Sequence, residues 1–238
     1  MPIVSETLGL DGEGELVARL RAHVAPDFGP ENVGHDLGHL DRVWGGCRLI
    51  AASEGGDREI LAAAAYLHDL HRALERRTGT PMRPQATADH VRAALAEVGF
   101  PATKADGVLA CVHASGTHSF ATDPESIDGL EPAILKDADN LDAMGAVGIA
   151  RACMFGAALG EPLLDPEVGY AGTYSPGRTR SIVHHFHEKL LRLEADMQTE
   201  TGLRLARDRH AYMVAFLEHL EEEIALVAAS EPLGGGVR

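Results

Sequence analysis

Apolar positions recur with helical spacing along most of this chain. One face of the segment after His39 shows the pattern, because apolar residues recur there at i, i+4, i+7 and i+8: Val43, Cys47, Ile50 and Ala51. Alternating runs rich in Val, Ile and Thr are nearly absent, and aromatic residues make up only 5% of the chain. The pattern therefore predicts an all-α fold.

Glycine, proline and N-capping residues divide this pattern into separate helices. We expect helices at residues 14–24, 39–54, 57–69, 85–98, 101–116, 131–152, 179–193 and 203–229. Residues 160–177 are rich in Gly and Pro and are expected to form a functional loop, such as a lid over a site. Without an internal repeat or a break in composition, we predict one domain over residues 1–230 and a disordered tail at 231–238.

Composition limits the classes of partner. A 238-residue chain with 45% hydrophobic residues can fill a sizeable core. The formal net charge of −15 repels polyanions and argues against nucleic-acid polymers, whereas a small phosphate ester depends only on the local field, which a bound cation can dominate. The cysteines are far apart, and no run of about 18 apolar residues occurs. We therefore expect a cytoplasmic protein with no disulfide, thiolate zinc site or membrane segment.

Histidine is the unusual component, with 13 residues that offer neutral metal ligands. A divalent ion needs ligands that converge from several elements and leave positions open for water and substrate. Candidate ligands stand at the start of one predicted helix, at the end of the next and inside the 131–152 helix: His39, His68, Asp69 and Asp139. Adjacent residues project about 100° apart on a helix, so His68 and Asp69 can share an ion only where the helix side or end faces a cavity.

These residues occur in motifs that resemble the HD-domain superfamily of metal-dependent phosphohydrolases. Its first His, His-Asp doublet and distant Asp are present in order. The small bacterial branch is the most similar: H-D-x-x-H-x-x-R-V-W lies at 35–44, H-x-x-x-x-H-S-F at 113–120, D-A-D-x-L at 137–141 and G-A-x-G-I-A-R at 145–151. Similar motifs at 185–191 and 197–206 extend the resemblance over roughly residues 33–220.

The resemblance implies a helical bundle that hydrolyses nucleoside triphosphates, notably deoxynucleotides, to monophosphate and pyrophosphate. The metal ligands would be His39, His68, Asp69 and Asp139, with manganese as the first candidate and magnesium, cobalt, nickel or iron as alternatives. Cationic side chains suit the phosphates, and the candidates are Arg42, Lys136, Arg151 and Lys189. His113 and His118 are assigned to a second metal or to substrate phosphate.

Two features leave alternatives open. Arg72 stands where some superfamily members carry an acid, so Asp69 and Asp137 are taken as catalytic candidates, with Asp142 and His71 as alternatives for the general base. Asp137 and Asp139 differ by about 200° around a helix, and Asp139 is chosen as the ligand from the A-D-x-L match alone. A phosphodiesterase, a phosphomonoesterase and a non-catalytic metal- or nucleotide-binding regulator remain rival functions. Oligomeric state is not determined by the sequence.

Overall fold

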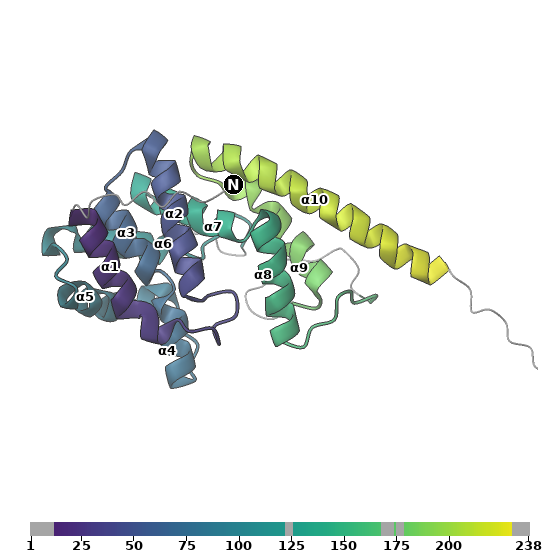
Figure 1. Ribbon diagram of the computed structural model, residues 1–238, viewed down its shortest axis with the longest axis horizontal. Coiled ribbons are helices and arrows are strands. Elements are labelled where there is room, and N and C mark those ends of the chain that lie inside the picture. Colours follow the sequence, from purple (N-terminus) through teal and green to yellow (C-terminus); the bar gives the residue numbers. More distant parts are fainter. Residues whose placement is uncertain (1–11, 122–125, 168–173, 175–178, 230–238) are drawn as a thin grey trace, which may run out of the picture.

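A computed structural model describes residues 12–121, 126–167, 174 and 179–229, and these ranges contain helices and no strand. The predicted all-α class is therefore confirmed. Figure 1 shows the elements: α1 (Gly12–Val24), α2 (Leu37–Glu54), α3 (Arg58–Leu67), α4 (Leu70–Thr78), α5 (Ala88–Glu97), α6 (Ala105–Ala114), α7 (Leu130–Asp142), α8 (Gly145–Ala158), α9 (Ile182–Glu188) and α10 (Glu200–Ala229). The predicted tail at 231–238 and much of the predicted loop at 160–177 lie outside the described residues.

The core forms around α3, which α1, α2, α6 and α7 all contact. Residues Ala62 to Ala65 are fully buried, and their small side chains let neighbouring helices approach from several sides. The α2 and α7 helices pack most closely at Gly46, where an added Cβ would lie 3.0 Å from the Cβ of Ala138. This close approach brings the N-terminal turn of α2 near the C-terminal turns of α7, where His39 and Asp139 lie.

The predicted helix at 131–152 is wrong, because two helices occupy this region. The α7 helix ends at Asp142, α8 begins at Gly145, and their axes differ by 69°. Gly145, the first residue of α8, has a φ of +67°, a left-handed conformation that favours glycine and that a continuous helix would not contain. The bend directs α8 back across the end of α7, so that Arg151 reaches Asp142.

No single helix in the described ranges has the length and apolar character needed to cross a membrane. The bent pair of α7 and α8 meets those criteria only when its two helices are taken together.

The predicted helix at 57–69 ends earlier, and a helix that the sequence did not predict follows it. The α3 helix ends at Leu67, and α4 starts at Leu70. His68 and Asp69 form the junction, where Asp69 leaves helical geometry with φ −94° and ψ 12°. The junction removes the 100° separation that a continuous helix would impose, so both side chains are free to point toward one place.

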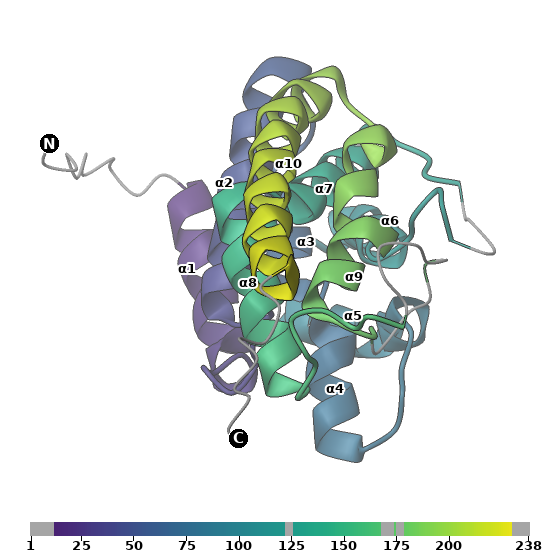
Figure 2. The same cartoon turned by 90° about the vertical axis from the view of Figure 1, so that its right-hand side faces the viewer.

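Near the C-terminus, α9 is shorter than the predicted 179–193 helix and is followed by 3₁₀ turns at Leu190–Arg192 and Glu194–Asp196. The α10 helix begins at Glu200, three residues before the predicted start, and packs on α8 and α7. Figures 1 and 2 show α10 crossing above α8, with its second half extending beyond the other helices.

Candidate metal centre

The sequence-predicted ligands converge at the junction of α2, α3, α4 and α7. His39 lies in the first turn of α2, whose N-cap Asp36 accepts a hydrogen bond from the His39 amide at 2.8 Å. His68 and Asp69 come from the α3–α4 junction, and Asp139 comes from α7. His39, His68 and Asp69 are buried, whereas the Asp139 side chain is 26% exposed.

The ligand atoms are separated by distances that suit one divalent ion. His39 Nε2 lies 3.3 Å from His68 Nε2, 3.4 Å from Asp69 Oδ2 and 3.6 Å from Asp139 Oδ1. His68 Nε2 lies 3.7 and 3.8 Å from the same carboxylate oxygens. Ligand atoms about 2.1 Å from an ion are about 3.0 Å apart at a right angle and about 3.4 Å apart at a tetrahedral angle. The two imidazoles and two carboxylates therefore fit a divalent ion after a small inward movement.

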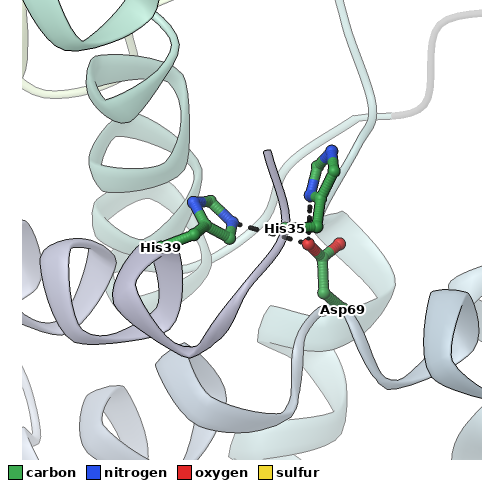
Figure 3. A group of neighbouring side chains, drawn as sticks. All are labelled: His35, His39 and Asp69. Atoms are coloured by element: carbon green, nitrogen blue, oxygen red, sulfur yellow. Dashed lines mark hydrogen bonds and ion pairs between the residues drawn. The ribbon is translucent and has the colours of Figure 1, made fainter. Parts of the chain in front are cut away.

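Within the described ranges, groups of His, Cys, Asp or Glu compact enough for a metal ion occur only here. One group is His39, His68 and Asp139, and an overlapping group is His35, His39 and Asp69. Figure 3 shows the imidazoles of His35 and His39 directed at the same Asp69 carboxylate. His35, the first residue of the motif at 35–44, was not among the predicted ligands, and the structure puts it in direct contact with one.

Both carboxylate oxygens of Asp69 accept hydrogen bonds from neighbouring side chains. His35 Nδ1 donates to Asp69 Oδ2 at 2.6 Å, and Arg72 Nε donates to Oδ1 at 2.9 Å. Burial alone would raise the pKa of Asp69, but His35 and Arg72 hold it well below its usual range. Burial lowers the pKa of His35 to about 3, so His35 is a neutral donor at neutral pH. Arg72 therefore positions a predicted ligand.

His39 is oriented by Asp142, the last residue of α7. His39 Nδ1 lies 2.8 Å from Asp142 Oδ2, which leaves Nε2 to face the ligand cluster. Arg42 donates to both oxygens of Asp142 at 2.6 and 3.0 Å, and Arg151 Nη1 lies 2.9 Å from Oδ2. A carboxylate behind a metal-binding imidazole fixes its tautomer and its ring orientation. Asp142 is therefore engaged by these partners, and its role is to position His39.

The cluster opens into a cavity of about 930 Å³. Asp69 and Asp139 line one part of it, and the cations Arg72, Arg151 and Lys189 line the surroundings. Burial lowers the pKa of Lys189 to about 8, although the Asp139 charge opposes that shift. The protein carries a large negative net charge, yet this cavity gathers several positive side chains. Such a site suits an anionic ligand.

Several predicted site residues lie elsewhere. Asp137 is fully buried and accepts hydrogen bonds from the amides of Gln198 and Thr199 at 2.8 Å and from the Thr199 hydroxyl at 2.7 Å. Its oxygens anchor the start of α10, which argues against a catalytic role. Lys136 is buried against Asp196 at 2.6 Å and also donates to the Thr117 carbonyl, so it is not available to phosphate.

Arg42 and His113 also differ from their predicted roles as substrate contacts. Arg42 is committed to Asp142, and neither residue lines the cavity. His113 lies at the end of α6, where its carbonyl accepts from Gln85 at 3.0 Å and its Nε2 is buried. His118, Arg151 and Lys189 do line the cavity. Of the alternatives for the base, only His71 does so, and its Nδ1 lies 3.3 Å from the His68 carbonyl.

Comparison with known proteins adds independent evidence. A family model described as HD domain matches residues 36–144, which include every predicted ligand. The Bacillus subtilis protein YpgQ is 34% identical over 212 residues, which cover 87% of this chain and 92% of YpgQ.

Solved structures show the same fold. The crystal structure of YpgQ in complex with ADP has a TM-score of 0.66 at 31% identity and aligns with 87% of this chain and 97% of that chain. A Lactobacillus plantarum protein has a TM-score of 0.70 at 28% identity, with 94% and 100% covered. An HD-superfamily hydrolase from Bacillus thuringiensis has a TM-score of 0.64 at 27% identity, with 90% and 97% covered.

The matched family model, the extended similarity to YpgQ and the convergence of two His and two Asp side chains all agree. The chain belongs to the HD-domain superfamily of metal-dependent phosphohydrolases.

Proposed function

We propose that this protein hydrolyses nucleoside triphosphates, including deoxynucleotides, to the monophosphate and pyrophosphate. The observation that carries the proposal is the position of the metal-ligand cluster at one wall of a cavity lined by Arg72, Arg151 and Lys189. A ligand with several phosphates needs several cations beside the ion. The similarity to YpgQ, whose crystal structure contains ADP, supports a nucleotide as the ligand.

His39, His68, Asp69 and Asp139 would hold a divalent ion, with manganese as the first candidate. When bound, such an ion lowers the pKa of water and offsets negative charge at a phosphoryl group. Asp69 serves as a ligand whose carboxylate His35 and Arg72 keep ionised and oriented. His39 presents Nε2 because Asp142 takes its Nδ1.

The cationic side chains of the cavity would bind and orient the phosphate chain: Arg151, Lys189 and Arg72. Arg151 is partly buried, donates to the Gly34 carbonyl and pairs with Asp142, so its guanidinium is fixed at the cavity wall. A fixed planar guanidinium can bind two phosphate oxygens at once. Lys189 supplies a point charge on the α9 side of the cavity. Both residues keep the substrate roles that the sequence predicted, and Arg72 joins them.

Product analysis tests this function. Nucleoside tri-, di- and monophosphates are incubated with manganese, magnesium, cobalt or nickel, and the products are separated by anion exchange. Pyrophosphate released from triphosphates supports the proposal. Orthophosphate from monophosphates supports a phosphomonoesterase instead. Manganese that raises thermal stability without product from any nucleotide would indicate a regulator that binds but does not turn over.

A further inference from the structure

His118 lines the cavity but does not belong to the ligand cluster, and the Asp196 carboxylate contacts one nitrogen of its ring. It lies in the loop after α6, is 5% exposed, and its Nδ1 is 3.0 Å from Asp196 Oδ2. Asp196 also accepts from Lys136 Nζ at 2.6 Å and from the Ser119 amide at 2.9 Å. Three donors thus converge on one buried carboxylate, which fixes the position of the imidazole.

This arrangement determines which nitrogen of His118 carries the proton. Asp196 is paired with an ammonium group, and the charges and hydrogen bonds around it lower its pKa, although burial opposes this. An ionised carboxylate only accepts hydrogen bonds, so His118 Nδ1 must be the donor. Burial lowers the pKa of His118 to about 4, and the ring is therefore neutral at neutral pH. Its Nε2 consequently has a lone pair.

His118 lines the cavity, and Nε2 is on the side of the ring opposite the nitrogen that contacts Asp196. Among the described residues, Nε2 has neither a hydrogen-bond partner nor a place in a metal cluster. A lone pair repels a phosphate oxygen, which has no proton to donate, but accepts a hydrogen bond from a hydroxyl or amino group. The predicted contact of His118 with phosphate therefore conflicts with its protonation state.

The surroundings of His118 suit the part of a nucleotide beyond its phosphates. The ring stacks on Phe120 with centroids 4.9 Å apart, and Tyr174 meets it edge-on at 5.6 Å. Lys189 lies 6.0 Å from the Tyr174 ring centre, and its charge acts on both His118 and Asp139. Lys189 is therefore near both Asp139 of the ligand cluster and the His118 and Tyr174 side chains that line the cavity. A substrate whose phosphates contact Lys189 would place its nucleoside near His118.

We propose that His118 Nε2 accepts a hydrogen bond from the nucleoside part of the substrate, either a sugar hydroxyl or a base amino group. Asp196 and Lys136 are the positioning residues that fix the tautomer. This inference rests on the proposed function, because it requires a nucleotide in the cavity. It makes His118 a specificity residue that separates nucleotides from inorganic polyphosphates.

Two matched variants test the acceptor. Asn places its amide near the Nδ1 position and leaves the Nε2 position empty, whereas Gln can place an oxygen near the Nε2 position. Calorimetry with the manganese-loaded protein measures dissociation constants for ADP and for pyrophosphate. We expect His118→Asn to weaken ADP binding about fivefold and His118→Gln to weaken it less, since one hydrogen bond contributes about 1 kcal/mol. Pyrophosphate binding should not change in either variant.

Nucleotide analogues identify the donor. If a sugar hydroxyl is the partner, 2′-deoxy or 2′,3′-dideoxy ADP removes the difference between wild type and His118→Asn. If a base amino group is the partner, inosine diphosphate removes it instead. His90→Phe, on the exposed surface of α5, controls for loss of a histidine outside the cavity.

Equal weakening of ADP and pyrophosphate would overturn the inference, because it would indicate a phosphate contact. No weakening of either ligand, or a loss that persists with every analogue, would also overturn it. Circular dichroism of each variant checks the helical content. Failure of the proposed function is distinct, since wild-type protein would then release no pyrophosphate from any triphosphate.

Discussion

Two aspartates of α7, only two positions apart, show how differently one helix can use the same side chain. Asp139 points toward the imidazoles of His39 and His68 and reaches the cavity. Asp137 points the opposite way, is fully buried and accepts three hydrogen bonds from Gln198 and Thr199. A buried carboxylate whose two oxygens both accept from protein donors stabilises the fold. A carboxylate that faces two imidazoles and the cavity remains available to a metal ion.

The two lysines near these aspartates differ in the same way. Lys136 is buried and committed to Asp196, so its charge serves the structure around α10 and His118. Lys189 lies at the cavity wall, and burial lowers its pKa. The side of α7 that carries Asp139 therefore faces the cavity in which hydrolysis is proposed. The side that carries Asp137 and Lys136 holds the C-terminal segment against the helical bundle.

The largest expected effect is on the cavity side. His68→Ala removes a buried ligand and should lower kcat/KM by about a thousand-fold, because a bound ion contributes several kcal/mol of charge stabilisation. The helical content should remain, since His68 lies at a helix junction and not within a helix. Initial rates of pyrophosphate release and circular dichroism measure the two properties. Retained hydrolysis would contradict the metal site.

The same substitution at both aspartates should separate the two sides of α7. Asp137→Asn turns an amide group toward backbone donors and should lower the free energy of unfolding by about 2 to 3 kcal/mol. Asp139→Asn should change it by less than about 1 kcal/mol but abolish the thermal stabilisation by manganese. Urea unfolding in chelator and thermal melts with metal measure these effects. Equal destabilisation by both variants would remove the distinction.

The smallest effect concerns the charge of Lys189. Its pKa in the folded protein, about 8, lies below the ordinary value of 10.5, so the side chain is cationic below pH 8 and loses its charge as the pH rises through 8. As the pH rises through 8, kcat/KM for a triphosphate should fall roughly tenfold, because a charged contact with phosphate is lost. Lys189→Arg keeps its charge and should lack this part of the decline. Identical profiles for both proteins between pH 7 and 9 would exclude Lys189 as a phosphate contact.

The fold was predictable where local signals are strong. Helical periodicity gave the all-α class, and the predicted helix from residue 57 corresponds to α3 with its N-cap Asp57. The break between α7 and α8 was missed because Gly145, among several small apolar residues, resembles the interior of a tightly packed helix. Only its φ of +67° shows that Gly145 opens α8 and does not continue α7. The α4 helix was missed although Ala73 and Leu74 form a buried face, because only three of its nine residues are apolar.

The sequence by itself determined the chemical types of the candidate ligands and their order along the chain: two imidazoles and two carboxylates, in motifs of one superfamily. Tertiary structure alone decided that Asp137, Lys136 and Arg42 are held by protein partners while Arg72 and His118 face the cavity. The physical reason is that a side chain can meet a ligand only where the packing of segments distant in sequence leaves it at the cavity wall. Those partners lie far away in sequence, Asp142 from Arg42 and Thr199 from Asp137.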